Sequence, residues 1–427
     1  MKLWKKFALC MSLALLVTGC GNKDSKNPSS EEKSSKSGEN VVRIAMWNPD
    51  QIATMKDIEK KYEEKNPGVD IQIEETTFKD HFTKLETQAQ GDVMPDIFTM
   101  NGPNFIKFAS NGVIEPLDDY LDKIGIKKED YPEGLINLYT YDNHLYGIPK
   151  DWDLTALFYN KKLFDEKGVS YPNKDWTWDD FVKAAEQLTD KDKGIWGTSF
   201  KPATQEGYYD TIPQCGGYII NKDKTKSGYD TEEAYDGIQR WIDIGEKGYS
   251  PDLKTLTDTN DTDLFKAGKI AMIYSGSWRI PEYLGDENIS KDIDLEIMPK
   301  IKERAATIHG LSYCLAKGSK NKDQALDFLA YLGSKEVNEM WAEKATVIPA
   351  NNKVLETWEK SYPDKNLKAF VDELEYSVPY PVSKNTPVWN AYEEDAINEM
   401  YSFNKPVKDV LKDLAQKMND ALEKEQN

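Results

Sequence analysis

Near its N-terminal end the chain changes hydrophobic period several times, and this alternation constrains the fold more than any other feature. Residues 41–47 are apolar and β-rich, and residues 69–74 place apolar side chains at every second position, as a half-buried strand does. Apolar residues at helical spacing lie between them and end at an Asn-Pro-Gly sequence. A helical stretch at residues 82–89 and an apolar strand at residues 96–100 follow. The order strand, helix, strand, helix, strand predicts a parallel, doubly wound α/β sheet.

After residue 149 the same kind of pattern starts again. Residues 156–159 form a short apolar segment, and the helix that follows begins with Thr177 and Asp180 spaced as a capping box. Three amphipathic stripes, typical of surface helices, lie at residues 234–242, 325–332 and 407–422. No repeat of solenoid or propeller period is present. With 427 residues, the chain is long enough for about two or three domains of roughly 150 residues each.

The first twenty residues have the organisation of a secretory signal. Three lysines precede an apolar run at residues 7–17. The run is shorter than the roughly 18 residues that a membrane-spanning helix needs, so cleavage is favoured over a permanent anchor helix. Residues 17–20 resemble the lipobox of bacterial lipoproteins. That resemblance implies acylation of Cys20 and a membrane anchor through this residue, on the extracytoplasmic face of the cell membrane.

Residues 21–40 are mostly Ser, Lys, Asn and Glu, with no large apolar side chain. Such a segment cannot bury a core, which predicts a flexible, solvated tether. The net charge of the whole chain is -19, and removal of the lysine-containing signal makes it more negative. Because an acidic surface repels nucleic acid, we expect no nucleic-acid partner.

The four cysteines do not form a disulfide framework. Cys10 lies in the signal and Cys20 at the lipobox, so only Cys215 and Cys314 remain to form a bridge. They are far apart and lack framework spacing, so two buried free thiols are favoured, with a disulfide as the alternative.

Catalytic motifs are absent from the sequence. There is no HExxH, GxSxG, GxxxxGK(S/T) or GxGxxG, and the only histidines, His81, His144 and His309, are far apart. No metal, cofactor or enzymatic activity is therefore expected. An extracellular carbohydrate-active enzyme stays open as an alternative, because a glycosidase needs only two suitably spaced carboxylates and the chain has 74 Asp and Glu residues.

Eight short segments stand in a characteristic order along the chain. They are MNGPNF at 100–105, YGIPKDWD at 146–153, YNKKLF at 159–164, WTWDDF at 176–181, GKIAM at 268–272, GSW at 276–278, GSKNK at 318–322 and VIPA at 347–350. In this order they resemble the extracellular solute-binding protein family 1, to which the maltose-binding protein belongs. The resemblance extends from residue 41 to the C-terminus, and the shared order is more specific than any single segment.

The resemblance implies a two-lobe α/β fold of the periplasmic-binding-protein type II, each lobe a doubly wound sheet with helices on both faces. The chain would cross between the lobes more than once, and a hinge motion would close them on a ligand. The expected divisions are a signal peptide at 1–19, a lipidated tether at 20–40, a first lobe at 41–149 and 307–345, and a second lobe at 150–306 and 346–427.

The family also implies a function. We expect a monomeric receptor of an ATP-driven ABC importer that reversibly binds a mono- or oligosaccharide and delivers it to a membrane permease. The alternative is a receptor for a non-sugar solute such as a phosphodiester or a glycoside. An anionic ligand would favour a cluster of cations, and Lys150 and Arg279 are too few to argue for one.

Candidate ligand contacts are the residues that directly follow predicted strands, because strand-to-helix loops meet at the cleft of such folds. Sugars need aromatic walls and fixed polar groups. The expected contacts are Trp47, Asn48, Asn101, Gly102, Trp152, Asp153, Trp278, Arg279, His309 and Trp389. Asn101 could instead belong to a turn, Arg279 to a surface ion pair, His309 to a solvated loop and Trp389 to the core. Many relatives carry an aromatic residue where this chain has Thr99.

Overall fold

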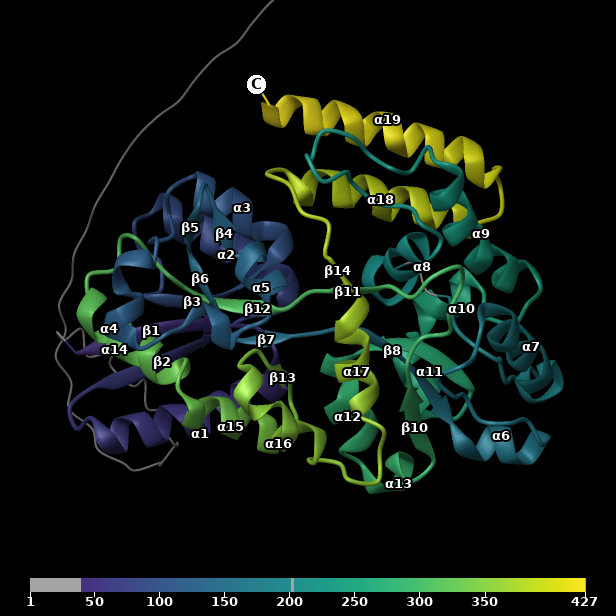
Figure 1. The fold of residues 1–427 in the computed structure, drawn as a ribbon, viewed down its shortest axis with the longest axis horizontal. Helices are drawn as coiled ribbons and strands as arrows, with labels where there is room; N and C mark the ends of the chain where they lie inside the picture. The colour runs from purple at the N-terminus through teal and green to yellow at the C-terminus, as the bar shows by residue number, and fades with distance from the viewer. Residues whose placement is uncertain (1–39, 201–202, 427) are drawn as a thin grey trace, which may run out of the picture. The chain divides into compact units, whose positions relative to one another are not determined.

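The computed structural model describes residues 40–200 and 203–426 (Figure 1). The predicted signal peptide, Cys20 and almost all of the tether lie outside the described residues. Within residues 40–200 and 203–426, no helix has the length and hydrophobicity that crossing a bilayer requires.

A five-stranded sheet with the order β2-β1-β3-β12-β6 forms the centre of what we call the first lobe (Figure 1). Its strands are β1 (Val41–Met46), β2 (Asp70–Glu75), β3 (Ile97–Asn101), β6 (Gly147–Pro149) and β12 (Leu311–Leu315). Strand β1 pairs in parallel with β2 and β3, which confirms the predicted β-α-β-α-β unit. Strand β12 is antiparallel to both β3 and β6, so the whole sheet is mixed.

Helices cover this sheet on two sides, with α3 on one side and α1 and α15 on the other (Figure 1). The first-lobe helices are α1 (Pro49–Lys65), α2 (Phe78–Gln90), α3 (Gly102–Ser110), α4 (Leu121–Ile124), α5 (Glu133–Leu138), α14 (Lys322–Leu332), α15 (Lys335–Lys344) and α16 (Leu355–Glu359). Helix α1 buries Ile52, Met55 and Ile58 at the spacing of one helical face. The amphipathic pattern therefore fixes which side of each helix meets the sheet.

The second lobe is built around a three-stranded sheet with the order β10-β8-β9. Its strands are β8 (Thr155–Asn160), β9 (Met272–Gly276) and β10 (Ile293–Glu296). All six residues of β8 are buried. Both strand pairs are antiparallel, whereas the repeated strand and helix pattern led us to expect parallel strands. A buried apolar run specifies that a strand is covered on both faces, but it does not specify the strand's direction.

The helices of the second lobe include each of the predicted amphipathic stripes of that region. They are α6 (Lys161–Lys167), α7 (Trp178–Leu188), α8 (Tyr209–Gln214), α9 (Glu232–Glu246), α10 (Leu253–Asp258), α11 (Asp261–Lys266), α12 (Ile280–Leu284), α13 (Glu287–Ser290), α17 (Lys368–Glu373), α18 (Thr386–Tyr401) and α19 (Val407–Gln426). The predicted capping box at α7 is confirmed, because Thr177 Oγ1 accepts from the Asp180 amide and the Asp180 carboxylate accepts from the Thr177 amide.

The chain passes between the two sheets three times. The first passage includes β7 (Asp151–Trp152) between β6 and β8, and the second lies between β11 (Ala306–Ile308) and β12. In the third, the chain leaves α16, which packs on α15, and enters α17, which packs on β8. Strand β14 (Ser377–Pro379) then pairs with β11 before α18 begins.

The packing of α16 and β13 suggests where the chain should be divided between the lobes. Helix α16 and β13 (Ile348–Pro349) both contact α15, and β13 pairs with β7. We therefore propose that residues 346–360 belong with the first lobe, and that the return to the second lobe comes after α16.

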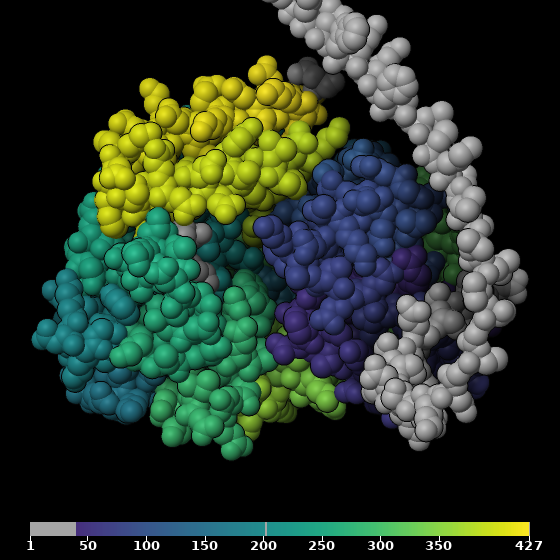
Figure 2. All heavy atoms as spheres, turned by 180° about the vertical axis from the view of Figure 1, so that it is seen from behind, coloured from purple at the N-terminus to yellow at the C-terminus, as the bar shows by residue number. Residues whose placement is uncertain are grey.

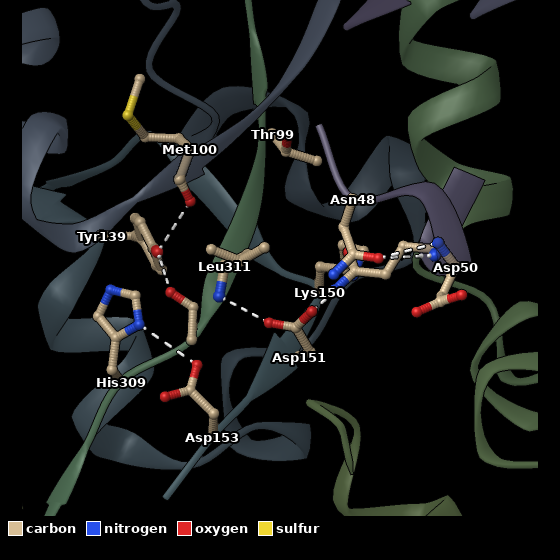
Figure 3. A network of polar contacts seen from close by, with 12 residues as sticks. Asn48, Asp50, Thr99, Met100, Tyr139, Lys150, Asp151, Asp153, His309 and Leu311 are labelled. Carbon is tan, nitrogen blue, oxygen red and sulfur yellow. Dashed lines mark hydrogen bonds and ion pairs between the residues drawn. The ribbon is translucent and has the colours of Figure 1, made fainter. Parts of the chain in front are cut away.

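The first passage contains a buried ion pair. Lys150 Nζ lies 2.5 Å from Asp151 Oδ2, and it donates to Gln51 Oε1 at 2.8 Å (Figure 3). The ammonium also lies 4.4 Å from the centre of the Trp341 ring. Burial lowers the pKa of Lys150 and raises the pKa of Asp151, and their mutual attraction opposes both shifts. The pair thus joins the first passage to α1 and α15.

The first two passages lie against each other. Asp151 Oδ1 accepts from the Leu311 amide at 2.7 Å, and the Tyr139 hydroxyl donates to the carbonyls of Met100 (3.0 Å) and Gly310 (2.5 Å) (Figure 3). A Cβ atom on Gly310 would lie 2.2 Å from the Asp151 carbonyl oxygen. Only glycine therefore permits this approach of the two backbones.

Both cysteines of the folded body, Cys215 and Cys314, are buried free thiols, as predicted. Burial raises the pKa of Cys215 to about 11 and that of Cys314 to about 12, so neither is a reactive thiolate at neutral pH.

We predict that Lys150→Met lowers the free energy of unfolding by about 3–5 kcal/mol, because it leaves the Asp151 carboxylate buried without its partner. The double variant Lys150→Met with Asp151→Asn should recover part of this loss. Lys65→Met, which breaks the exposed pair with Glu336, is the control and should change stability little. Urea denaturation of the wild type and the three variants measures the free energy of unfolding. Equal losses for Lys150→Met and the control would contradict the structural role of the pair.

Candidate functional site: a cleft between the lobes

A cleft of about 1290 Å³ lies where the passages and the ends of several strands meet. Figure 2 shows it as a hollow between the purple and blue surface of the first lobe and the green surface of the second, beneath the yellow α18. Eight of the ten expected contacts line it, namely Trp47, Asn48, Asn101, Trp152, Asp153, Trp278, Arg279 and His309. The loops after strands do converge at this cleft, whereas ligand contact by these residues remains a prediction.

Asn48 and Asn101 both cap helices that begin at the cleft. Asn48 Oδ1 accepts from the amides of Asp50 and Gln51 at the start of α1. Asn101 Oδ1 accepts from the Asn104 amide at 3.2 Å and from the Asn104 side chain at 2.9 Å. Asn101 thus ends β3 and caps α3 rather than forming the turn that we had considered, and it lies at the cleft wall.

His309 and Asp153 connect the first two passages at the floor of the cleft. Their backbones exchange hydrogen bonds of 2.8 and 3.1 Å, and His309 Nδ1 lies 3.3 Å from Asp153 Oδ2 (Figure 3). The Gly102 amide donates to His309 Nε2 at 3.2 Å. Because an amide can only donate, Nε2 is the acceptor and the ring proton is on Nδ1, where it donates to Asp153. The side chain of Gln205 also donates to Asp153.

Gly102 contributes to this arrangement through its backbone amide, which donates to the His309 ring. It does not line the cleft, so our expectation of a ligand contact there is wrong. An added Cβ would come within 3.0 Å of Leu138 and 3.4 Å of the His309 ring. The residue begins α3, and its amide is used by His309 rather than by a ligand.

Trp152 and Trp278, two of the expected ligand contacts, differ in exposure. Trp152 is only 1% exposed, and its Nε1 has no hydrogen-bond partner among the described residues. Trp278 is half-buried and lies over Gly276, where an added Cβ would come within 2.1 Å of the indole ring. Glycine at position 276 therefore lets the ring lie on the strand end, and Trp278 is the more accessible surface for stacking.

Arg279 is held by two carboxylates. Its Nη1 donates to Glu282 Oε1 at 2.8 Å, and Glu206 adds to the favourable field around the guanidinium. Glu206 Oε1 in turn accepts from Ser275 Oγ and from the Gly276 amide. The ion pair that we had considered for Arg279 is present, and it lies at the cleft rather than elsewhere on the surface.

Trp389 lies in the core, so the prediction that it contacts ligand is wrong. It is fully buried, and its Nε1 donates to Ser383 Oγ at 2.8 Å. Helix α18 turns other residues to the cleft, at a spacing of three or four. They are Pro387, Asn390, Glu394 and Ile397. Position 389 lies one residue off this face, about 100° around the helix.

Several cleft residues escaped the sequence analysis. Gln205 and Glu206 belong to a segment, Thr204–Tyr208, whose backbone is not regular helix at Glu206 and Gly207. Tyr380 follows β14, and its ring centre lies 4.8 Å from that of His309. Neither segment has a hydrophobic period, so no sequence signal placed it. The face of α18 could have been found from its spacing of three and four residues.

The charges that line the cleft are mainly acidic. Seven carboxylate residues line it, namely Asp50, Glu75, Asp151, Asp153, Glu206, Glu282 and Glu394. Arg279 is the only lysine or arginine among the described lining residues. No group of three His, Cys, Asp or Glu residues in the described chain could hold a metal ion. The cleft can therefore accept hydrogen bonds from many hydroxyls but offers little to a dianion.

These features, two α/β lobes, three connecting passages and a polar cleft with aromatic walls, define a two-lobe binding protein. Residues 58–369 match the family described as bacterial extracellular solute-binding protein. The chain belongs to this family.

Relatives with assigned ligands cover most of the chain. It is 28% identical to the galactooligosaccharide-binding protein of Bacillus subtilis, over 82% of each sequence. It is 25% identical to the arabinooligosaccharide-binding protein of the same species, over 79% of each. Among solved structures, an ABC substrate-binding protein from Listeria monocytogenes in complex with cycloalternan is 25% identical, with a TM-score of 0.84, covering 90% of this chain and 99% of that one.

Behind the cleft, Glu393 is fully buried in α18. Its carboxylate accepts from Tyr209 (2.8 Å), Asn390 (2.7 Å) and Tyr229. Burial nevertheless raises the pKa of Glu393 to about 7, because these donors only partly replace water around the charge.

We predict that this carboxyl makes stability depend on pH. An unfolded glutamate has a pKa of about 4.3, so the folded state binds the extra proton between that value and about 7. The contribution is complete below pH ~4.3 and is lost as pH rises through ~7, by about 4 kcal/mol. The free energy of unfolding of the wild type, relative to that of Glu393→Gln, should fall by this amount. Denaturant titrations across this pH range measure it.

Glu394→Gln is the matched control, because Glu394 is the exposed neighbour on the same helix. Its pH profile should parallel that of the wild type. A Glu393→Gln profile parallel to the wild type would instead show that Glu393 ionises normally.

Proposed function

We propose that this chain reversibly binds a carbohydrate in the cleft by closure of the two lobes, without altering the ligand chemically. One observation carries the proposal: a single cleft combines a half-buried Trp278 with the fixed polar pair of His309 and Asp153. Aromatic faces suit the C–H surfaces of a sugar ring, and fixed carboxylate, amide and imidazole groups suit its hydroxyls.

The names of the relatives support the same ligand class. The two Bacillus subtilis proteins are named for oligosaccharides, and the Listeria monocytogenes structure contains cycloalternan. A phosphodiester receptor is disfavoured, because Arg279 is already paired with Glu282 and no other lysine or arginine among the described residues lines the cleft.

We further propose that the protein is the monomeric receptor of an ABC importer and delivers its ligand to a membrane permease. The proposal includes cleavage of the signal at residues 1–19 and lipid anchoring of Cys20 on the extracytoplasmic side of the cell membrane. Membership of an extracellular binding-protein family and the lipobox-like sequence support these points. Anchoring needs several acyl chains, since one chain binds a bilayer only marginally.

Thermal shift with a panel of carbohydrates tests the proposal. A sugar at 100 times its Kd should stabilise the folded state by about 2.7 kcal/mol and raise Tm, because it binds only the folded chain. Analysis of the sugar after incubation should recover it intact. A panel without any stabilising sugar would reject the carbohydrate assignment, and cleaved product would favour the enzyme alternative.

Trp278→Ala should weaken binding of the stabilising sugar by roughly 1–3 kcal/mol if the indole stacks on it, as aromatic stacking on rings does elsewhere. Calorimetric titration measures the change. Trp176→Ala removes another half-buried tryptophan, which does not line the cleft, and should bind as the wild type does. Equal affinities for the two variants would remove Trp278 from the site.

A further inference from the structure

Asn390 is the residue of α18 that connects a buried carboxyl to the cleft. Its side chain lines the cleft, and Glu393, one helical turn further along α18, is fully buried behind it. Asn390 Nδ2 donates to Glu393 Oε2 at 2.7 Å and to the Tyr209 hydroxyl at 3.3 Å. The Tyr209 hydroxyl donates to the same Glu393 oxygen at 2.8 Å. The three side chains therefore form a closed ring of hydrogen bonds at the cleft wall.

This ring determines which end of the Asn390 amide faces the cleft. A carboxylate can only accept hydrogen bonds, so the amide must turn its amino group toward Glu393. None of the described residues donates to Asn390 Oδ1. Because Asn390 lines the cleft and its amino group is held by the wall, its carbonyl oxygen is left to accept a hydrogen bond from a ligand hydroxyl.

The titratable groups that face the Glu393 carboxyl are tyrosines. Tyr229, ahead of α9, donates to Glu393 Oε1, and Tyr209 of α8 donates to Oε2. Tyr208, the residue before α8, and Tyr380, after β14, also interact with its charge. Burial raises the pKa of all four phenols, so they stay neutral. Helices α3, α9 and α19 also pack on α18, and no described residue within them is among the groups that shift the pKa of Glu393.

Protonation of Glu393 weakens the ring, because every neighbour that bonds to the carboxyl is a donor. A carboxylic acid carries a proton that needs an acceptor of its own. A tyrosine hydroxyl can rotate to accept it, whereas the Asn390 amino group cannot. Hydrogen bonds to an ionised group are roughly twice as strong as neutral ones, so the amide is held most firmly by the carboxylate. Since the pKa of Glu393 is raised to about 7, both forms are present at neutral pH.

We infer that Glu393 is a positioning residue of the cleft, which links ligand binding to the release of a proton. A ligand hydroxyl that donates to Asn390 Oδ1 polarises the amide and strengthens its bond to the carboxylate, because connected hydrogen bonds reinforce one another. Binding thereby favours the ionised form, and the proton lost by the carboxylic acid passes to solvent. By linkage, the ionised form binds the ligand more tightly by the same factor. The inference rests on the proposed function and adds its regulation by pH.

Calorimetric titration from about pH 5.5 to about pH 8.5 tests the inference. The probes are glucose, galactose, arabinose and a disaccharide of each, and the one that binds most tightly is used throughout. Its affinity for the wild type should be about three- to tenfold higher at the upper end of this range, since a tenfold change corresponds to a shift of about one unit in the pKa. Titrations in buffers of different ionisation enthalpy should show that binding releases a proton.

Three variants assign the proton to Glu393. Glu393→Gln keeps the size of the side chain without the titrating group, so its affinity should not change with pH. Tyr229→Phe removes a donor to Glu393 and does not alter the lining of the cleft. Because that donor favours the ionised form, its loss should move the profile to higher pH. Glu399→Gln is the matched control, since Glu399 lies on the same helix, pairs with Lys405 and does not line the cleft. It should keep the wild-type profile.

A second measurement needs no ligand. Nuclear magnetic resonance of isotope-labelled glutamate carboxyl carbons follows the titration of Glu393 in the folded chain. Asn390→Ala removes a donor to the carboxylate and should move the midpoint of this titration to higher pH. Thermal unfolding checks that the variant is folded. An unchanged midpoint would show that Asn390 and the Glu393 charge are not coupled, and it would overturn the inference.

The outcomes separate the inference from the proposed function. A wild-type affinity that does not vary with pH would reject the link to a proton and leave carbohydrate binding intact. A pH dependence that persists in Glu393→Gln would also reject it, because another titrating group of the cleft, such as His309, would then be responsible. If no probe binds the wild type at any pH, the proposed function is rejected, and the inference is rejected with it.

Discussion

The buried ion pair between Lys150 and Asp151 is the interaction on which the arrangement of this molecule depends. Two full charges lie at the point where the chain leaves the first sheet, and each is stable there only because the other is present. Asp151 also holds the amide of Leu311, and Lys150 holds α1 through Gln51. The two passages are thereby fixed at one point, and a residue without a Cβ, Gly310, allows their backbones to meet.

The same passages place the polar floor of the cleft. His309 and Asp153 face each other because the two passages run antiparallel and pair at these residues. The Gly102 amide donates to His309 Nε2, which keeps the ring proton on Nδ1. The polar groups at the floor of the cleft therefore belong to the passages between the lobes. In a protein whose lobes close on a ligand, groups at the hinge move least, while groups on the lobes, such as Trp278, approach those of the opposite lobe. A floor of fixed polar groups between movable aromatic walls suits reversible binding of a polar, ring-shaped solute.

Much of the first lobe could be predicted, and eight of the ten expected contacts do line the cleft. The alternation of hydrophobic period specified the first three strands and their helices, and the ends of these strands pointed to Trp47, Asn48 and Asn101. The errors have physical causes. Gly102 supplies a backbone amide, a role that every non-proline residue shares, and Trp389 lies one position off the face of α18 that meets the cleft. Gln205 and Tyr380 lie in irregular segments, where no period relates a residue to a direction in space.

The sequence by itself determined which segments are helices and strands, that the chain forms α/β lobes, and which family it resembles, because these follow from local periodicity and from the order of short motifs. Only the tertiary structure decided the antiparallel direction of β12 and of the second sheet, the burial of Lys150, and the contacts of Phe78 and His81 with the Trp47 ring. Those features join residues that are distant along the chain or lie on different elements. Their free energy depends on packing and desolvation in the assembled fold, and local sequence carries no record of either.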